Sequence, residues 1–274
     1  MLSTTSYTFG TMSLGLNPAD VNADMEVARR AIAAGVWFHS SPTYRSGFTY
    51  MVLRMAFDED RSRIPRLILK VRDGSVALMR FEVEDSCRRL GVDGIDIAQL
   101  VSMDPRPGNL VDQLRAGKGV LVDELASLRD RGLVRGAVLF ITRENADAAV
   151  EAAGSDLIDG VTLYWNALQR DCTDAAWERI RRQSIPVLAL RTLGGGSADK
   201  AAAEKAVALQ ELIQRAGCRD ATEFNLRLMA AEPCIRTTIG GTASLNHLEG
   251  YLAAALHPEP LDAAIVSQVD ALRA

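Results

Sequence analysis

Three side chains that can transfer protons stand where two short apolar runs of the sequence pass into loops. His39 and Tyr44 lie in the run and loop from Gly35 to Tyr44, and Lys70 lies in the run from Leu67 to Val71. Both runs have the apolar character of β-strands. In α/β barrels the catalytic groups sit at the carboxyl ends of such strands. We therefore take Tyr44, Lys70 and His39 as the candidate catalytic residues.

The chemistry expected of these residues is acid–base catalysis. An ammonium group near a phenol stabilises the phenolate, so Lys70 is expected to lower the pKa of Tyr44 and to prepare its hydroxyl for proton donation to a carbonyl oxygen. His39 is one of three histidines in the chain and stands where an acid–base group can reach a substrate. The alternative is that these residues are only structural. Tyr44 would then be an ordinary loop aromatic, Lys70 a solvated cation and His39 a packed histidine. Trp37 and Trp165 can form an aromatic wall for a flat ligand, or can pack in the core.

Short apolar runs alternate with amphipathic helices along the chain. The expected strands occupy residues 7–14, 36–39, 67–71, 95–101, 137–141, 160–165, 186–190 and 235–239. Eight such strands covered by helices predict an α/β fold, a (β/α)8 TIM barrel. The 274 residues, 48% of them hydrophobic, suffice for one barrel domain spanning residues 1–274. A doubly wound open sheet is the alternative, but no Gly-x-Gly-x-x-Gly motif follows an early strand.

The composition excludes several kinds of partner. A net charge of −4, with both signs scattered along the chain, does not provide the basic surface that nucleic acids bind. No apolar run approaches the roughly 20 residues of a membrane span, and the first residues lack a signal-peptide pattern. The protein is therefore expected to be soluble and cytoplasmic, with no nucleic-acid or membrane partner. Its widely spaced cysteines predict reduced, mostly buried thiols and no metal site: Cys87, Cys172, Cys218 and Cys234.

Several motifs resemble the opening of an aldo-keto reductase. Phe9 to Gly15 reads Phe-Gly-Thr-x-x-Leu-Gly, an expected helix ends in Ala-Ala-Gly at Gly35, and a Ser-Pro loop then carries Tyr44. The resemblance continues in register to the expected eighth helix and implies a (β/α)8 barrel. It also implies a catalytic tetrad of Asp, Tyr, Lys and His, in which Tyr44 and Lys70 match the Tyr and the Lys.

The other two tetrad positions differ from the family pattern. The Asp position falls on His39 or Ser40, depending on a one-residue gap, and the His position at the end of the fourth strand falls on Val101. Half of the tetrad implied by the resemblance is therefore replaced.

The resemblance implies a nicotinamide cofactor, NADP or NAD, and a small-molecule substrate with a carbonyl group. The family's ligands of the nicotinamide carboxamide fall on Phe140, Ile141 and Thr162, which do not replace them. Glycine-bearing loops after the last two strands are retained, and such backbone can bind phosphate through free N–H groups. The alternative is that these glycines serve tight turns of the barrel rim. The candidate cofactor-binding residues follow the last three expected strands: Asn166, Arg191, Thr192, Leu193, Gly194, Gly240, Gly241 and Thr242.

Three functions remain open from the sequence. The first is NAD(P)H-dependent reduction of a small carbonyl compound, with Tyr44 as proton donor, Lys70 tuning the phenol, and His39 or Arg191 orienting the substrate. The second is a cofactor-independent acid–base enzyme, an isomerase, dehydratase or cyclase, in which His39, Tyr44 and Lys70 only move protons. The third is a barrel that binds a ligand without catalysis. Weak or absent dinucleotide binding is expected because the carboxamide ligands are missing.

Overall fold

The computed structural model describes residues 4–16, 20–102, 106–193, 202–255 and 258–273, and in these ranges eight parallel strands form a closed barrel. The barrel strands are β1 (Tyr7–Gly10), β2 (Trp37–Ser40), β3 (Leu67–Arg72), β4 (Ile95–Val101), β5 (Val134–Phe140), β6 (Gly160–Asn166), β8 (Val187–Leu190) and β9 (Ile235–Gly240). Strands β9 and β1 pair in parallel, as do β5 and β6, and these pairings close the sheet. The predicted (β/α)8 barrel is confirmed.

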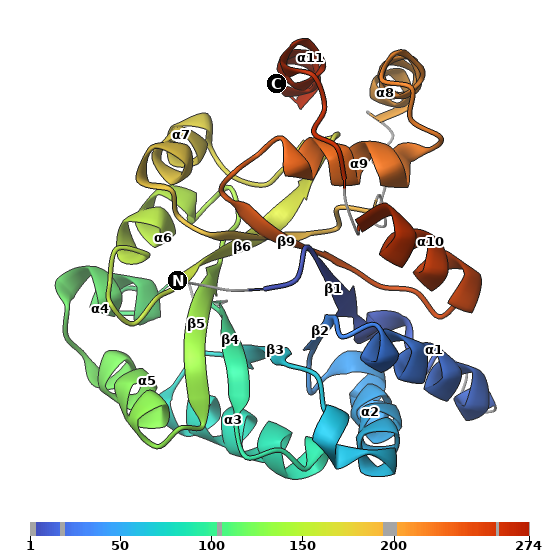
Figure 1. The fold of residues 1–274 in the computed structure, drawn as a ribbon. Helices are drawn as coiled ribbons and strands as arrows, with labels where there is room; N and C mark the ends of the chain where they lie inside the picture. The colour runs from blue at the N-terminus through green and yellow to red at the C-terminus, as the bar shows by residue number, and fades with distance from the viewer. Residues whose placement is uncertain (1–3, 17–19, 103–105, 194–201, 256–257, 274) are drawn as a thin grey trace.

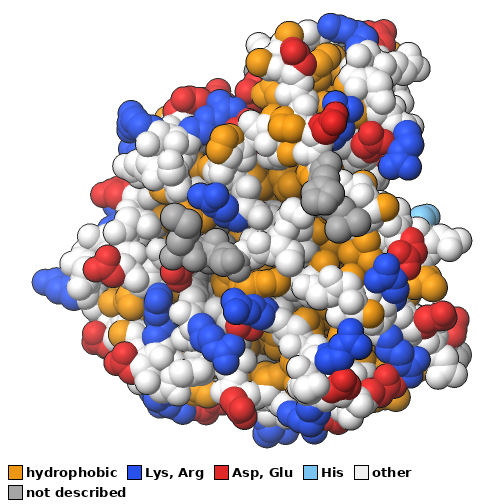
Figure 2. Space-filling model, viewed as in Figure 1, with side chains coloured by type: hydrophobic (Ala, Val, Ile, Leu, Met, Phe, Trp, Pro, Cys, Tyr) orange, Lys and Arg blue, Asp and Glu red, His pale blue; other side chains and the backbone are white. Residues whose placement is uncertain are grey.

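Helices surround the strands on the outside of the barrel, with α8 and α11 beyond α9 (Figure 1). They are α1 (Val21–Ala33), α2 (Phe48–Glu59), α3 (Val76–Leu90), α4 (Leu110–Ala116), α5 (Val120–Asp130), α6 (Ala146–Ala152), α7 (Asp174–Gln183), α8 (Ala202–Arg215), α9 (Ala221–Ala230), α10 (Leu245–Ala255) and α11 (Ala263–Arg273). No described helix has both the length and the apolar character needed to cross a bilayer. On the face shown in Figure 2, acidic and basic side chains are intermixed.

Side chains along each strand point alternately into the barrel and toward the helices. Trp37, Ile68 and Ile97 belong to the cluster that fills the barrel, whereas their neighbour Phe38 packs in the larger core between sheet and helices. Because this alternation has a period of two, His39 and Lys70 point inward as Trp37 and Ile68 do. Both side chains are therefore placed near the carboxyl end of the barrel interior.

The ends of two strands differ from the sequence prediction. Strand β1 stops at Gly10 and the chain turns through a short 3-10 helix, Thr11–Ser13, where a strand was expected as far as Leu14. The Thr11 hydroxyl donates to the carbonyl oxygen of His39 at 3.1 Å, which ties this turn to β2. Strand β5 begins at Val134, three residues before the expected start, because Val134 pairs with β4. The length of a strand thus depends on how far the neighbouring strand pairs with it. The periodicity of apolar residues in the sequence does not reveal that pairing.

Two short elements were missed by the sequence analysis. Helix α4 lies between β4 and α5, and the Asn109 side chain caps it by accepting the N–H of Asp112 at 3.0 Å. Strand β7 (Gln169–Arg170) pairs antiparallel with the end of β6 as a small hairpin outside the barrel. The four cysteines are buried free thiols, in agreement with the expected burial.

Candidate active site

The carboxyl ends of the barrel strands enclose a cavity of about 420 Å³. All three candidate catalytic side chains, Tyr44, Lys70 and His39, line it. They come from β2, from the loop after it and from β3, so the closed sheet brings together groups that are up to 31 positions apart in the sequence. This is the end of the barrel where (β/α)8 enzymes carry their chemistry.

A short loop after β2 holds Tyr44 in place. Tyr44 begins a single 3-10 turn in which Arg45 and Ser46 take left-handed backbone angles, with φ of +50° and +53°. Such angles are costly for residues other than glycine and persist where surrounding structure enforces them, often at functional sites. One restraint is Arg89, which donates to the carbonyl oxygen of Gly47 at 3.0 Å. The loop therefore presents Tyr44 to the cavity from a constrained backbone.

Lys70 lies beside Tyr44 but does not act on it as expected. Its Nζ sits over the phenol ring, 5.2 Å from the ring centroid, which is a cation–π contact. Burial raises the pKa of Tyr44 well above its ordinary value, and Tyr164 raises it further. The expected lowering of the Tyr44 pKa is wrong, because burial disfavours the charged phenolate. Tyr44 therefore stays protonated at neutral pH, which is the state that a proton donor needs.

Two cations share the cavity. Burial lowers the pKa of Lys70, and the neighbouring Arg191 guanidinium lowers it further. Arg191 stacks on the Tyr164 ring, with its Cζ 3.8 Å from the ring centroid. No carboxylate is found among the described residues that line the cavity. Within the same described ranges, no group of three His, Cys, Asp or Glu side chains is placed to hold a metal ion.

His39 is a buried neutral group. It is 2% exposed, and its Nε2 lies 2.5 Å from Oε1 of Gln99. Burial lowers the pKa of His39 to about 3, with the Lys70 cation contributing in the same direction and the Gln99 hydrogen bond opposing. A neutral His39 can donate its Nε2–H to Gln99 and keep Nδ1 as an acceptor.

Gln99 was not a candidate from the sequence. It lies on β4 directly beside Lys70 of β3 in the sheet register. Its position two residues after the inward-facing Ile97 was the signal that could have found it, since a polar side chain at an inward position of an apolar strand needs a partner inside the barrel. The hydrogen-bond partner of His39 is thus the neutral side chain of Gln99.

The predicted cofactor-binding residues fall into two groups. Four of them line the cavity: Arg191, Leu193, Gly240 and Gly241. The other described ones form hydrogen bonds within the chain: Asn166, Thr192 and Thr242. Gly194 lies outside the described residues.

The side chains of the second group already form hydrogen bonds with other parts of the protein. Asn166 donates from Nδ2 to the carbonyl oxygen of Arg191 at 3.2 Å, and its Oδ1 accepts the N–H of Leu168 at 2.8 Å. Thr192 is fully buried and donates to a strand β8 carbonyl oxygen. The Thr242 hydroxyl accepts the N–H of Ser244 at 2.9 Å, just before α10. These side chains shape the rim of the cavity rather than its wall.

The rim glycines are needed for close packing. A Cβ on Gly241 would lie 2.1 Å from the carbonyl oxygen of Gly10, and a Cβ on Gly240 would lie 2.1 Å from Cδ1 of Leu193. The contact at Gly241 is with backbone of β1, which cannot move aside as a side chain can. The close approach of Gly241 to the end of β1 therefore accounts for this glycine.

Gly241→Ala is expected to lower the free energy of unfolding by about 1–3 kcal/mol, because overpacking forces the strand ends apart. The matched control is Gly250→Ala, where an added Cβ meets nothing within 4 Å and where a helical alanine gains up to about 1 kcal/mol. Urea unfolding of the two variants checks this. Equal stability of Gly241→Ala and the unchanged protein would contradict the packing explanation.

The aromatic wall of the cavity comes from residues that the sequence analysis did not select. Tyr164 and Tyr251 line it, and Tyr164 packs edge-on against Phe140 with ring centroids 5.5 Å apart. Trp165 instead points away from the cavity and is fully buried, and Trp37 lies deeper in the barrel, two residues before the mouth. Both tryptophans thus pack in the core, which was the alternative to an aromatic wall around a ligand.

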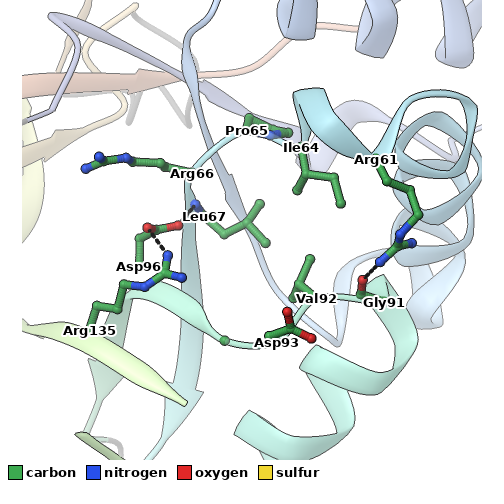
Figure 3. A pocket seen from close by; sticks show the side chains of 11 residues that line it. Arg61, Ile64, Pro65, Arg66, Leu67, Gly91, Val92, Asp93, Asp96 and Arg135 are labelled. Atoms are coloured by element: carbon green, nitrogen blue, oxygen red, sulfur yellow. Dashed lines mark hydrogen bonds and ion pairs between the residues drawn. The ribbon is translucent and has the colours of Figure 1, made fainter. Parts of the chain in front are cut away.

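A second cavity, of about 530 Å³, opens at the opposite end of the barrel, where β3 and β4 begin (Figure 3). Several of its charged groups are partnered by the protein: Asp96 pairs with Arg135 at 2.7 Å, and Arg61 donates to the carbonyl oxygen of Gly91. Arg66 stacks over Trp37 at 5.3 Å. None of the candidate catalytic residues reaches it, so this cavity is not the candidate active site.

The structure is a (β/α)8 barrel with a cavity at the carboxyl ends of its strands, lined by Tyr44, Lys70 and His39. The model of the aldo/keto reductase family matches residues 7–274. The chain belongs to the aldo/keto reductase family.

Solved structures show the same fold at low sequence identity. An aldo-keto reductase from Bacillus halodurans, AKR11C1 in its holo form, is 19% identical with a TM-score of 0.79, covering 100% of this chain and 94% of that chain. An aldo/keto reductase from Klebsiella pneumoniae, in complex with NADP and acetate, is 20% identical with a TM-score of 0.75, covering 100% of this chain and 96% of that chain. No curated protein sequence matches the chain significantly.

Proposed function

We propose that this protein reduces a small carbonyl compound with NADP(H) or NAD(H), and that Tyr44 donates the proton. The observation that carries the proposal is the meeting of the Tyr44 and Lys70 side chains in one cavity at the mouth of the barrel. Family membership supports it, as does the Klebsiella pneumoniae relative that was solved with NADPH. A cytoplasmic location is part of the same proposal.

The residues of the cavity fit the phosphate end of a nicotinamide dinucleotide. The Arg191 guanidinium has no ion pair within the described residues, and it lines the same cavity as Gly240 and Gly241. A guanidinium and free backbone N–H groups are the donors that phosphate oxygens accept. No amide side chain lines the described part of the cavity, so the carboxamide has no dedicated ligand there. Such a cofactor, when bound, supplies the hydride.

The chain's own residues supply proton transfer and shielding from water. Tyr44 is protonated because burial raises its pKa, so its hydroxyl can donate to the carbonyl oxygen as that oxygen gains charge. The Lys70 cation over the ring favours the phenolate that remains after donation. His39, fixed by Gln99, offers Nδ1 as an acceptor that orients a substrate hydroxyl or water. Leu190 in the wall helps to exclude water.

Titration with NADPH and NADH, followed by nicotinamide fluorescence, tests the cofactor part of this proposal. We expect a dissociation constant above about 1 μM, because only the phosphate end is held by charge. Arg191→Gln should raise it about tenfold or more, since hydrogen bonds to charged groups contribute about 1.5–3 kcal/mol. Arg66→Gln, at the opposite end of the barrel, is the matched control. Sub-micromolar binding that Arg191→Gln leaves unchanged would refute this assignment of the cofactor's ligands.

A second candidate is a cofactor-independent acid–base enzyme, an isomerase, dehydratase or cyclase. The specific observation in its favour is the absence of any amide side chain from the described cavity wall, together with the apolar Phe140 and Ile141 at the family's ligand positions. In this candidate Tyr44 and His39 would be the two proton-transfer groups.

Replacing His39 separates the two candidates. In the reductase, His39→Gln should lower turnover by less than about tenfold, because the neutral ring only orients the substrate. In a hydride-free enzyme the same change should cost about 10²–10⁴-fold, the usual contribution of a positioned acid or base. The measurement is turnover with and without NADPH. His247→Gln, on the exposed face of α10, serves as control; a severe loss without any cofactor requirement would overturn the reductase.

A further inference from the structure

Two buried carboxylates elsewhere in the described chain have partners of opposite sign. Glu82 and Glu124 are each 4% exposed, and an arginine holds each of them. Arg72 Nη2 lies 2.5 Å from Glu82, and Arg80 Nε lies 2.9 Å from Glu124. This pairing offsets the cost of removing a carboxylate from water. Lys70, at the cavity mouth, departs from this pattern.

The surroundings of Lys70 make its charged form less favourable than it is in water. Within the described residues its Nζ makes no hydrogen bond and no ion pair; it lies over the face of the Tyr44 ring, with Arg191 and His39 nearby. No described side chain in the cavity wall carries a negative charge. A lysine that is removed from water and placed near another cation loses its proton more easily and becomes a nucleophile.

We propose that Lys70 condenses with a carbonyl ligand of this cavity to form an imine. The Nζ lone pair attacks the carbonyl carbon, and a C–N bond forms while the C=O π bond breaks. The amine gives up two protons, which leave with the carbonyl oxygen as water, and a C=N bond replaces C=O. Tyr44, which lines the same cavity and is protonated, relays the proton that the departing oxygen needs. No oxidant or reductant takes part.

Arg191 indicates the class of carbonyl ligand. It lies in the cavity wall with Lys70, stacked on Tyr164, and makes no ion pair in the described part of the chain; the carboxylate of Asp171 interacts with it only at longer range. A guanidinium in this position can bind a carboxylate through two parallel hydrogen bonds. A compound with a carboxylate next to its carbonyl group, a 2-oxo acid, would place the anion on Arg191 and the carbonyl carbon at Lys70. The cavity of about 420 Å³ holds a molecule of this size.

Reductive trapping without any nicotinamide cofactor tests the proposal. Pyruvate is the probe, sodium cyanoborohydride reduces any imine to a stable secondary amine, and peptide mass mapping locates it. The sequence has four lysines, at positions 70, 118, 200 and 205, so the assignment is direct. We expect the adduct on Lys70, with at least tenfold less on the exposed Lys118. Lys70→Arg should lose the adduct, and Lys118→Arg should keep it.

The pH dependence provides a second readout. Only the neutral amine attacks, so trapping should rise with pH through the pKa of Lys70, which lies below its ordinary value. Arg191→Gln removes the neighbouring cation and raises that pKa, so the midpoint of the rise should move to higher pH in a protein whose circular dichroism is unchanged. Absence of an adduct from the folded protein, equal labelling of Lys70 and Lys118, or a midpoint unmoved by Arg191→Gln would overturn the proposal.

The outcome is independent of the reductase assignment. Trapping contains no NADPH, and turnover with NADPH does not require an imine. The two reactions also depend on opposite protonation states of Lys70, since the ammonium supports Tyr44 in proton donation whereas the amine attacks the carbonyl carbon. Failure of trapping with intact NADPH-dependent turnover refutes the imine alone, and the reverse pattern refutes the reductase alone.

Discussion

Tyr44→Phe is expected to lower turnover by about 10²–10⁴-fold while the protein remains folded, since this is the contribution of a positioned general acid. The change removes only the hydroxyl, and the ring that Lys70 contacts remains. The cation–π contact and the strained loop should therefore survive. Steady-state turnover of the substrate, with circular dichroism to monitor the fold, is the measurement.

Tyr251→Phe is the matched control for this prediction. Tyr251 lines the same cavity and is half-buried, like Tyr44, so its variant loses a hydroxyl from the same space. We expect a change of less than about threefold, because Tyr251 does not lie beside Lys70. Full activity of Tyr44→Phe would remove Tyr44 from the mechanism, and equal losses in both variants would mean that the cavity tolerates no change of polarity anywhere.

Trp165→Ala should lower the free energy of unfolding by about 3–5 kcal/mol, the range for truncation of large buried aromatics. Trp165 is fully buried, its ring centroid lies 6.4 Å from that of Trp177, and the Arg273 guanidinium sits 4.5 Å over it. Arg273 also donates to the carbonyl oxygen of Asn166 at 2.9 Å, which fastens α11 to the end of β6. Truncation of Trp165 therefore has two effects. It opens a cavity in the core, and it removes the ring on which Arg273 packs.

Chemical denaturation monitored by circular dichroism measures this loss. Phe81→Ala is the control, because Phe81 is 62% exposed on α3 and its removal should change stability by less than about 0.5 kcal/mol. At temperatures where Trp165→Ala is still folded, its dissociation constant for NADPH should stay within about threefold of the unchanged protein. A loss of binding without a loss of stability would instead place Trp165 in the ligand site.

The barrel and its catalytic candidates were predictable because both depend on local pattern. Alternating apolar runs and helices determine a parallel sheet covered by helices, and the rule that sites lie at the carboxyl ends of strands selects His39, Tyr44 and Lys70. The closed sheet places all three in one cavity. Strand ends were less predictable, as β1 and β5 show, because a strand extends only as far as its partner does.

The charge states in the site could not be predicted from spacing. A lysine near a tyrosine was expected to lower the tyrosine pKa, yet burial raises the pKa of Tyr44 and lowers that of Lys70. The reason is that desolvation depends on how completely the surrounding strands and loops remove each group from water, which is a property of the whole barrel. The same holds for His39, whose neutral state depends on burial inside the sheet.

The chain's sequence by itself determined the alternation of strands and helices, the family pattern and the residue types at the strand ends. Only the tertiary structure decided which of those residues face the cavity. Arg191 reaches the cavity, whereas Asn166 and Thr242 hydrogen-bond within the rim, and Gly241 is required by the backbone of β1 across the closed sheet. The physical reason is that a side chain's partners come from strands distant in sequence, and barrel closure alone sets their distances.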